Sequence, residues 1–145
     1  MGLEGDRKKG KWKKDWSFYF KKQMKNKLSV TAFFEVGKEY RAPMYIATSD
    51  NKSNCLKTFC RRAQHPPVLY EFRLDPELGC VHVNYVDRTN IPGEREFLFV
   101  PYSVFTVMSV QWRENPTWVS PHVVVLSVAI DNALCGEELP LAPWH

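Results

Sequence analysis

Two glutamates, Glu94 and Glu96, have the type and spacing that acid chemistry requires. They flank Arg95 and lead into an apolar run over residues 97–100. Residues two apart project from the same face of a β-strand. Two neighbouring carboxylates disfavour each other's ionisation, and carboxylates perturbed in this way gather at functional sites. The pair is therefore a candidate catalytic site, and the same pattern also suits a solvent-facing pair at a strand edge.

The second half of the chain predicts the strands that must position these glutamates. Short apolar runs, several of them alternating with polar residues and separated by turn sequences, predict strands over residues 68–74, 81–86, 96–100, 103–112 and 122–130. Asp-Pro-Glu-Leu-Gly at 75–79 predicts a turn, and Pro101 separates two of the strands. Glu96 would therefore begin a strand, with Glu94 in the loop before it.

The first half of the chain predicts helices and one extended segment. Aromatic residues recur at spacings of three and four, which favours a helix over residues 12–27 whose aromatic stripe packs into a core. An extended segment is expected at 40–48. Ser49 or Asp50 would then cap a helix over 51–63, because either side chain can accept a hydrogen bond from a free amide at the helix start.

These elements predict the fold class and the domain boundaries. The fold class is α+β: an N-terminal helix followed by a β-rich core of antiparallel and mixed strands. Residues 1–11 are expected to be a disordered basic arm and residues 12–145 a single domain. Its tail, 139–145, holds two prolines and is expected to be a packed strap.

Charge is distributed unevenly along the 145 residues. The formal net charge is +4, but residues 1–27 hold ten lysines and arginines against three acidic residues. Such a segment is typical of a tether to nucleic acid or another anionic partner through residues 7–27, and equally of a solvated helix face.

Cysteine and hydropathy patterns indicate a cytosolic protein. The four cysteines, Cys55, Cys60, Cys80 and Cys135, lack C-x-x-C spacing, so free thiols are expected, with a disulfide left open. No secretory signal and no apolar run long enough to span a bilayer occurs in the sequence. His82 lies on a predicted strand and is expected to be a satisfied or exposed histidine rather than a metal ligand.

The run from residue 36 to 107 resembles the NAD-dependent mono-ADP-ribosyltransferases of the R-S-E type. In that family a Gly precedes a strand ending in a Ser-Thr-Ser-like motif, and a helix, two strands, Glu-x-Glu and an apolar strand follow. The matching series here is Gly37, Tyr45-Ile46-Ala47-Thr48-Ser49, Leu56 to Phe59, 68–72, Gly79, 81–83, Glu94-Arg95-Glu96, 97–101 and 104–107. The resemblance covers about half of the chain and implies the same fold.

The resemblance also implies roles for particular residues. Glu96 would be the catalytic glutamate, which stabilises the oxocarbenium-like state as nicotinamide leaves NAD. Glu94 would orient the acceptor nucleophile, often an arginine guanidinium. Residues flanking and underlying the nicotinamide ring would be Thr48, Ser49, Tyr45 and Phe59. NAD would be the substrate, and no metal would be needed.

Two departures from the family pattern affect NAD binding. Ala47 stands where the motif has its first serine, and Thr48 or Ser49 would have to supply the hydroxyl. The family also has an early strand whose arginine grips the NAD phosphates. No segment before Gly37 is predicted to be that strand, and Arg41 comes too late in the chain to be that arginine.

These residues lead to a ranked set of functions. The first is transfer of ADP-ribose from NAD to a protein side chain such as arginine, or hydrolysis of NAD. The second is a catalytically inactive, β-rich binding module of the same fold, acting in protein or nucleic-acid interaction. The third is an unrelated β-sandwich interaction protein.

Overall fold

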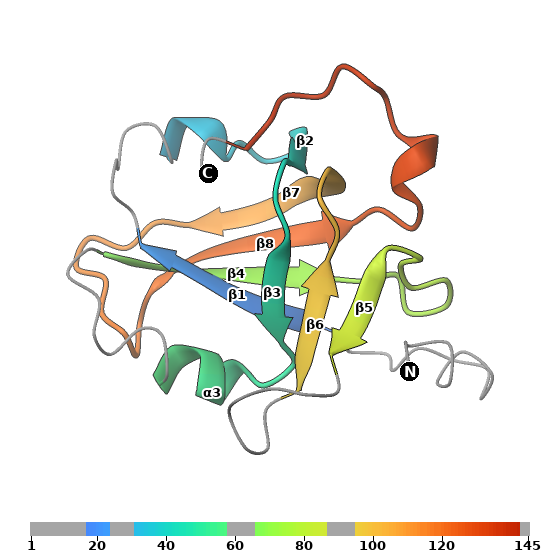
Figure 1. Ribbon diagram of the computed structural model, residues 1–145. Coiled ribbons are helices and arrows are strands. Elements are labelled where there is room, and N and C mark those ends of the chain that lie inside the picture. Colours follow the sequence, from blue (N-terminus) through green and yellow to red (C-terminus); the bar gives the residue numbers. More distant parts are fainter. Residues whose placement is uncertain (1–16, 24–30, 58–65, 87–94, 143–145) are drawn as a thin grey trace.

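The computed structural model describes residues 17–23, 31–57, 66–86 and 95–142 (Figure 1). In these residues eight strands form a single sheet: β1 (Ser17–Gln23), β2 (Glu39–Ala42), β3 (Ile46–Ser49), β4 (Pro67–Arg73), β5 (Val83–Val86), β6 (Glu96–Phe99), β7 (Ser103–Gln111) and β8 (His122–Val128). A short helix, α3 (Lys52–Cys55), and a 3-10 turn, η2 (Asn132–Leu134), are also described. None of the helices in these residues is long and apolar enough to cross a membrane.

The sheet is mixed, as predicted. Its strand order is β2-β7-β8-β4-β1-β3-β6-β5, in which β4 and β8 run parallel and all other neighbours antiparallel. Figure 1 shows β3, β6 and β5 running steeply across the direction of β7, β8, β4 and β1. The sheet therefore has two parts, which meet where β1 pairs with β3.

The prediction of a helix over residues 12–27 is wrong for its centre. Residues Ser17–Gln23 form strand β1, and all seven pair antiparallel with β4. Three consecutive aromatic residues in this segment suit a strand, and pairing with β4 on one side and β3 on the other overrides the helical spacing. The basic arm therefore does not continue through 17–23 as a solvated helix face. The rest of the predicted helix lies outside the described residues, as do residues 1–11.

The extended segment predicted at 40–48 is two strands in different parts of the sheet. β2 pairs with β7, whereas β3 pairs with β6. Pro43 lies between them, and its missing amide cannot continue a strand ladder. The break allows one stretch of chain to serve both parts of the sheet.

The cap of the following helix also differs from the prediction. Asn51, rather than Ser49 or Asp50, is the N-cap of α3, and its side chain accepts a hydrogen bond from the Asn54 amide. Ser49 Oγ in turn accepts from the Asn51 amide at 3.1 Å. The described helix ends at Cys55, and residues 58–63 of the predicted helix are outside the described part of the chain.

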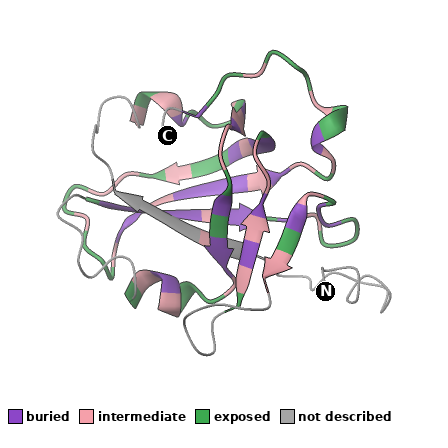
Figure 2. Cartoon of the chain, in the orientation of Figure 1, coloured by how far each residue is buried: buried purple, intermediate pink, exposed green. Residues whose placement is uncertain are grey.

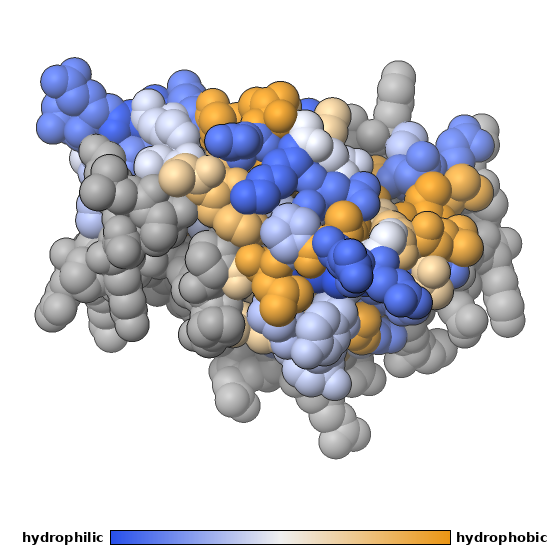
Figure 3. Space-filling view, turned by 90° about the horizontal axis from the view of Figure 1, so that it is seen from above, coloured by the Kyte–Doolittle hydropathy of each residue, from blue (hydrophilic) through white to orange (hydrophobic). Residues whose placement is uncertain are grey.

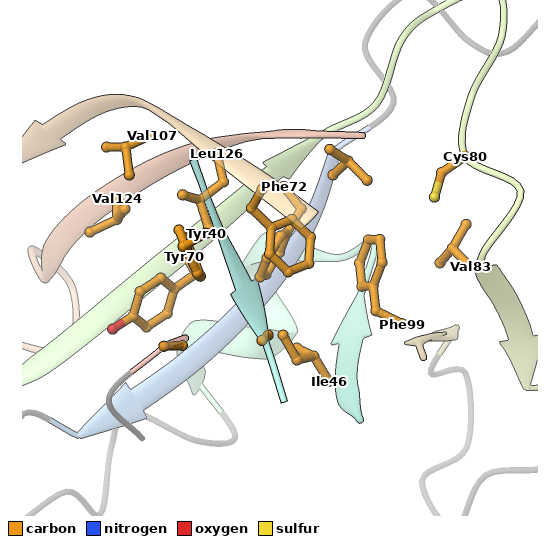
Figure 4. Packing of buried hydrophobic residues seen from close by; sticks show 14 of the residues in the cluster. Tyr40, Ile46, Tyr70, Phe72, Cys80, Val83, Phe99, Val107, Val124 and Leu126 are labelled. Atoms are coloured by element: carbon orange, nitrogen blue, oxygen red, sulfur yellow. The ribbon is translucent and has the colours of Figure 1, made fainter. Parts of the chain in front are cut away.

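The hydrophobic core joins both parts of the sheet. Strand β4 has its first four residues buried, as expected for a central strand covered on both faces (Figure 2). The core cluster includes Phe72 of β4, Phe99 of β6 and Phe105 of β7, with ring centroids 4.9 to 5.4 Å apart. Figure 4 shows Ile46, Phe99 and Val83 gathered with Phe72 and Leu126 in this cluster. The two parts are thus one packed body.

The tail is a packed strap, as predicted for residues 139–142. Arg41 of β2 forms a bridge with Leu141, and its guanidinium donates to the carbonyl oxygens of Tyr102 at 2.9 Å and Gly136 at 2.7 Å. Ala142 is buried. Figure 3, seen from above, shows the hydrophobic residues of this side as separate clusters with hydrophilic residues between them. Arg41 therefore holds the strap through its backbone, while its guanidinium binds carbonyl oxygens in the loops at Tyr102 and Gly136.

Three of the four cysteines lie in the described residues. Cys55 and Cys80 are buried and Cys135 is partly buried. Burial also raises the pKa of the Cys135 thiol, with a further contribution from the nearby Glu39 carboxylate. Cys60 lies outside the described residues. Of the histidines, His82 contacts Asp131 at 2.9 Å (Nε2 to Oδ1), so it is a satisfied, half-exposed side chain.

Candidate functional site

The candidate site is built on one cross-strand row of residues. Strand pairing places Glu96 of β6 opposite Ser49 of β3, Ser49 opposite Tyr19 of β1, and Glu96 opposite Val86 of β5. Directly opposed residues of antiparallel strands share one face of a sheet. The four side chains therefore share a face across four strands, at the point where the two parts of the sheet meet.

That face is the open face of β3, β6 and β5. Residues two positions further along the same face are Ala47 of β3, Leu98 of β6 and Asn84 of β5, which are exposed, half-buried and exposed. Glu96 is itself half-buried and Ser49 is buried. The opposite face points into the core, because Phe97 and Phe99 are fully buried. Glu96 consequently lies on the face away from the Phe97 and Phe99 core, where its side chain is partly exposed.

Thr48 and Ser49 are adjacent but point to opposite faces. The Thr48 side chain is 3% exposed, and its hydroxyl donates to the Phe97 carbonyl oxygen at 2.7 Å across the β3–β6 pair. Ser49 shares the face of Glu96, and its oxygen accepts from the Asn51 amide. Its own hydroxyl proton can therefore be directed towards the opposed residue. Of the two hydroxyls, Ser49's is placed beside Glu96 and Thr48's serves the core.

Of the remaining residues assigned from the resemblance, one lies away from the Ser49–Glu96 pair and two lie outside the described part of the chain. Tyr45 is 62% exposed and precedes the first residue of β3. At about 3.3 Å per strand residue it lies about 13 Å along the strand from Ser49. Glu94 and Phe59 lie outside the described residues. The structure thus brings Glu96 and Ser49 together and places Tyr45 towards the far end of the same strand.

Sequence reasoning missed the contribution of β1. The prediction that no segment before Gly37 forms an early strand is wrong, because β1 lies directly beside β3. Its Tyr19 is half-buried and occupies the row of Ser49 and Glu96. The signal was present in the run of Phe18, Tyr19 and Phe20, since consecutive aromatic residues favour strands more than helices.

Arg95 and Asp50 form a clamp beside the row that the sequence did not reveal. Arg95 Nε lies 3.3 Å from Asp50 Oδ2. Asp50 follows Ser49 and Arg95 precedes Glu96, so both residues lie just beyond the Ser49–Glu96 pair that ends the β3–β6 ladder. The Arg95 guanidinium carbon also lies 5.8 Å from the Tyr85 ring centroid and 5.5 Å from that of Phe97. The start of β6 is thus tied to the ends of both β3 and β5.

Solved structures of bacterial ADP-ribosyltransferases share this fold. The Vis toxin of Vibrio splendidus, an ADP-ribosyltransferase, is 18% identical with a TM-score of 0.57, over 81% of this chain and 50% of its own. The catalytic domain of VahC from Aeromonas hydrophila is 19% identical with a TM-score of 0.55, over 80% and 61%. C3stau2 from S. aureus, solved with NAD, is 15% identical with a TM-score of 0.53, over 78% and 61%.

These comparisons confirm the resemblance at the level of the fold. The chain spans about half of the length of the Vis toxin and about three fifths of the other two structures. No protein-family model matches the chain, and no curated protein matches it in sequence. The chain therefore has an ADP-ribosyltransferase-like fold.

Proposed function

We propose that the protein transfers ADP-ribose from NAD to a protein side chain, or hydrolyses NAD, with Glu96 as its catalytic carboxylate. The observation that carries this proposal is the pairing of Glu96 with Ser49 on the open face, within an ADP-ribosyltransferase-like fold. One of the similar structures was solved with NAD, which supports NAD as the substrate.

The proposed chemistry needs a negative charge beside a developing cation. Cleavage of the bond between nicotinamide and its ribose leaves positive charge on the sugar, and a preorganised carboxylate stabilises that charge. Glu96 supplies the carboxylate from the first position of β6. Ser49 supplies a hydroxyl from the opposed strand, which offsets the loss of the hydroxyl at Ala47.

Strand β1 is the proposed counterpart of the family's early strand. It runs beside β3, and its sequence, SFYFKKQ, contains no arginine but two lysines, Lys21 and Lys22. Lysine binds phosphate as a point charge, without the two parallel hydrogen bonds that arginine forms. We therefore expect weaker NAD binding than an arginine would give.

The proposed acceptor is a guanidinium group. The Vis ADP-ribosyltransferase was solved in complex with agmatine, a small molecule that carries a guanidinium group. Glu94 would orient such an acceptor, since a carboxylate accepts two hydrogen bonds from a guanidinium. Replacement of Glu94 by Gln should reduce transfer to agmatine more than hydrolysis of NAD.

The decisive experiment is nicotinamide release from NAD by the wild type and by Glu96→Gln. The substitution is nearly isosteric and removes the charge, so we expect the rate to fall about a hundredfold to a thousandfold. Glu77→Gln is the matched control, because Glu77 is exposed in the turn after β4 and should leave the rate unchanged. Equal rates in the wild type and Glu96→Gln would contradict the catalytic role.

A second function, an inactive binding module of the same fold, has its own supporting observations. Ala47 presents a methyl group on the open face, and β1 has no arginine in its sequence. A titration with NAD separates the two functions. Binding without nicotinamide release favours an inactive module that still recognises NAD, and no binding at millimolar NAD favours a module for another partner.

A further inference from the structure

We propose that Arg95 is a positioning residue: its clamp to Asp50 and to the β5–β6 rings sets the direction of the Glu96 carboxylate. This inference rests on the proposed function of Glu96. Arg95 lies between the two glutamates in the sequence, but alternation along the strand sends its side chain to the face opposite Glu96. There it contacts Asp50, Tyr85 and Phe97.

The clamp joins three strands at one end of the sheet. Asp50 follows the last residue of β3, Tyr85 lies near the end of β5, and Arg95 precedes the first residue of β6. The Tyr85 and Phe97 rings themselves pack with centroids 5.3 Å apart, and Phe97 is fully buried. A guanidinium over such rings is attracted by their electron-rich faces. The Arg95 cation therefore lies over a pair of packed aromatic rings.

Asp50 is held in place more firmly than an ordinary surface carboxylate. On one side Ser49 accepts from the Asn51 amide, and on the other Asn51 caps α3 through the Asn54 amide. The backbone on both sides of Asp50 is thus restrained by hydrogen bonds. Its side chain is 27% exposed and that of Arg95 is 44% exposed, so the pair is partly shielded from water.

Glu96 depends on this clamp because it begins a strand of only four residues. A terminal pair in a short ladder opens easily, and opening would rotate the Glu96 side chain. Catalytic groups must be held within about 0.5 Å and 10–20° of their working geometry. The clamp restrains the residue before Glu96 at the point where the ladder ends, and so should affect catalysis rather than NAD affinity.

The test measures nicotinamide release by Arg95→Gln, Asp50→Asn, the double variant and Arg95→Lys. We expect kcat to fall about tenfold in each of the first two, with KM for NAD changed less than twofold, since the terminal contact holds the carboxylate and not the substrate. The double variant should lose no more than either single one, and Arg95→Lys should retain part of the rate because it keeps the charge.

Arg73→Gln is the matched control. Arg73 Nε also pairs with a carboxylate, Glu71 Oε1 at 2.9 Å, but on β4 and away from the start of β6. This variant should release nicotinamide at the wild-type rate. Three results would overturn the proposal. The first is a fall in kcat in Arg95→Gln no larger than in Arg73→Gln, and the second is a double variant whose fall in kcat is the full product of the two single ones. The third is a KM for NAD that rises as much as kcat falls.

Backbone amide exchange separates failure of this inference from failure of the proposed function. If the wild type releases no nicotinamide, the catalytic role of Glu96 is lost. The positioning role still predicts that amides of residues 96–99 and 46–49 exchange faster in the clamp variants than in the wild type. We expect about tenfold faster exchange there in Arg95→Gln and Asp50→Asn, with no change in Arg73→Gln. Unchanged exchange in the first two variants would overturn the positioning role.

Discussion

Strands β4 and β8 are long and largely buried, whereas β3 and β6 are short and open on one face. β4 and β8 have seven residues each, and β3 and β6 have four each. In β6 the burial alternates, with Phe97 and Phe99 buried and Glu96 and Leu98 only partly so. The two parts of the sheet share a core. Their second faces differ, because that of β4 and β8 is largely buried, whereas that of β6 is partly exposed to solvent.

The difference shows that strands buried on both faces stabilise the fold, while strands with one open face can carry the reactive side chains. A strand covered on both faces must be apolar on both, so it has little room for polar side chains. A strand with one open face can keep its core contacts on alternate residues and present carboxylates and hydroxyls on the others. Glu96 occupies a position of the second kind, and Ser49, although itself buried, lies opposite Glu96 on the same face.

The largest expected effect is on the stability of the β4–β8 part. Phe72→Ala should lower the free energy of unfolding by about 3–5 kcal/mol, because it removes a buried ring and leaves a cavity. Leu98→Ala, on the open face of β6, should lower it by about 1 kcal/mol or less, since much of that side chain is already in water. Urea unfolding of both variants measures the difference. Equal losses of unfolding free energy would show that the buried strand β4 does not stabilise the fold more than the open face of β6.

A smaller effect should distinguish the two faces of β3. Thr48→Val removes the buried hydrogen bond to the Phe97 carbonyl and should lower the free energy of unfolding by about 1 kcal/mol, with nicotinamide release unchanged. Ser49→Ala should instead reduce nicotinamide release about tenfold, the equivalent of one hydrogen bond to a charged group.

Each variant of this pair is the control for the other, because the two residues are neighbours on one strand. Unfolding by urea and nicotinamide release would be measured on both. A loss of activity in Thr48→Val as large as that in Ser49→Ala would show that the face of the side chain does not decide its role.

The sequence predicts the secondary structure of the second half of the chain better than that of the first half. Alternation and turn residues place β4 and β6 to β8 nearly correctly and β5 within a few residues, because their local pattern agrees with their place in the sheet. Ser17–Gln23 is predicted wrongly, since its aromatic residues fit a helical spacing and only pairing with β4 and β3 decides for a strand.

The candidate site follows the same division. Glu96 is found from its residue type and spacing, and Ser49 from the resemblance to the ADP-ribosyltransferases, while their opposition is a property of the β3–β6 register. Tyr19 and the Arg95–Asp50 contact depend on pairing between segments distant in the sequence. No spacing along the chain encodes such contacts, so they could not be predicted from the residues alone.

The smallest expected effect concerns how the two parts are joined outside the core. Asp131 follows β8 and His82 precedes β5, and they meet at 2.9 Å. The hydrogen bond from His82, and then that from the Ala133 amide, hold the pKa of Asp131 below its ordinary value of 3.8. Folding therefore favours the ionised carboxylate, and its stabilisation is complete above that value and is lost as the pH falls through the folded-state pKa.

Replacement of Asp131 by Asn should remove this acid-sensitive contribution. The wild type should be more stable than Asp131→Asn at pH 5, and the difference should shrink as the pH is lowered towards 2. Both side chains are about one third exposed, at 32% and 34%, so water screens the contact and the difference should be small at every pH. Urea unfolding at several pH values measures it, with His82→Gln as the variant that keeps a hydrogen-bond donor. A difference that is constant or grows at low pH would show that the carboxylate does not link β8 to β5, and that the shared core alone joins the two parts.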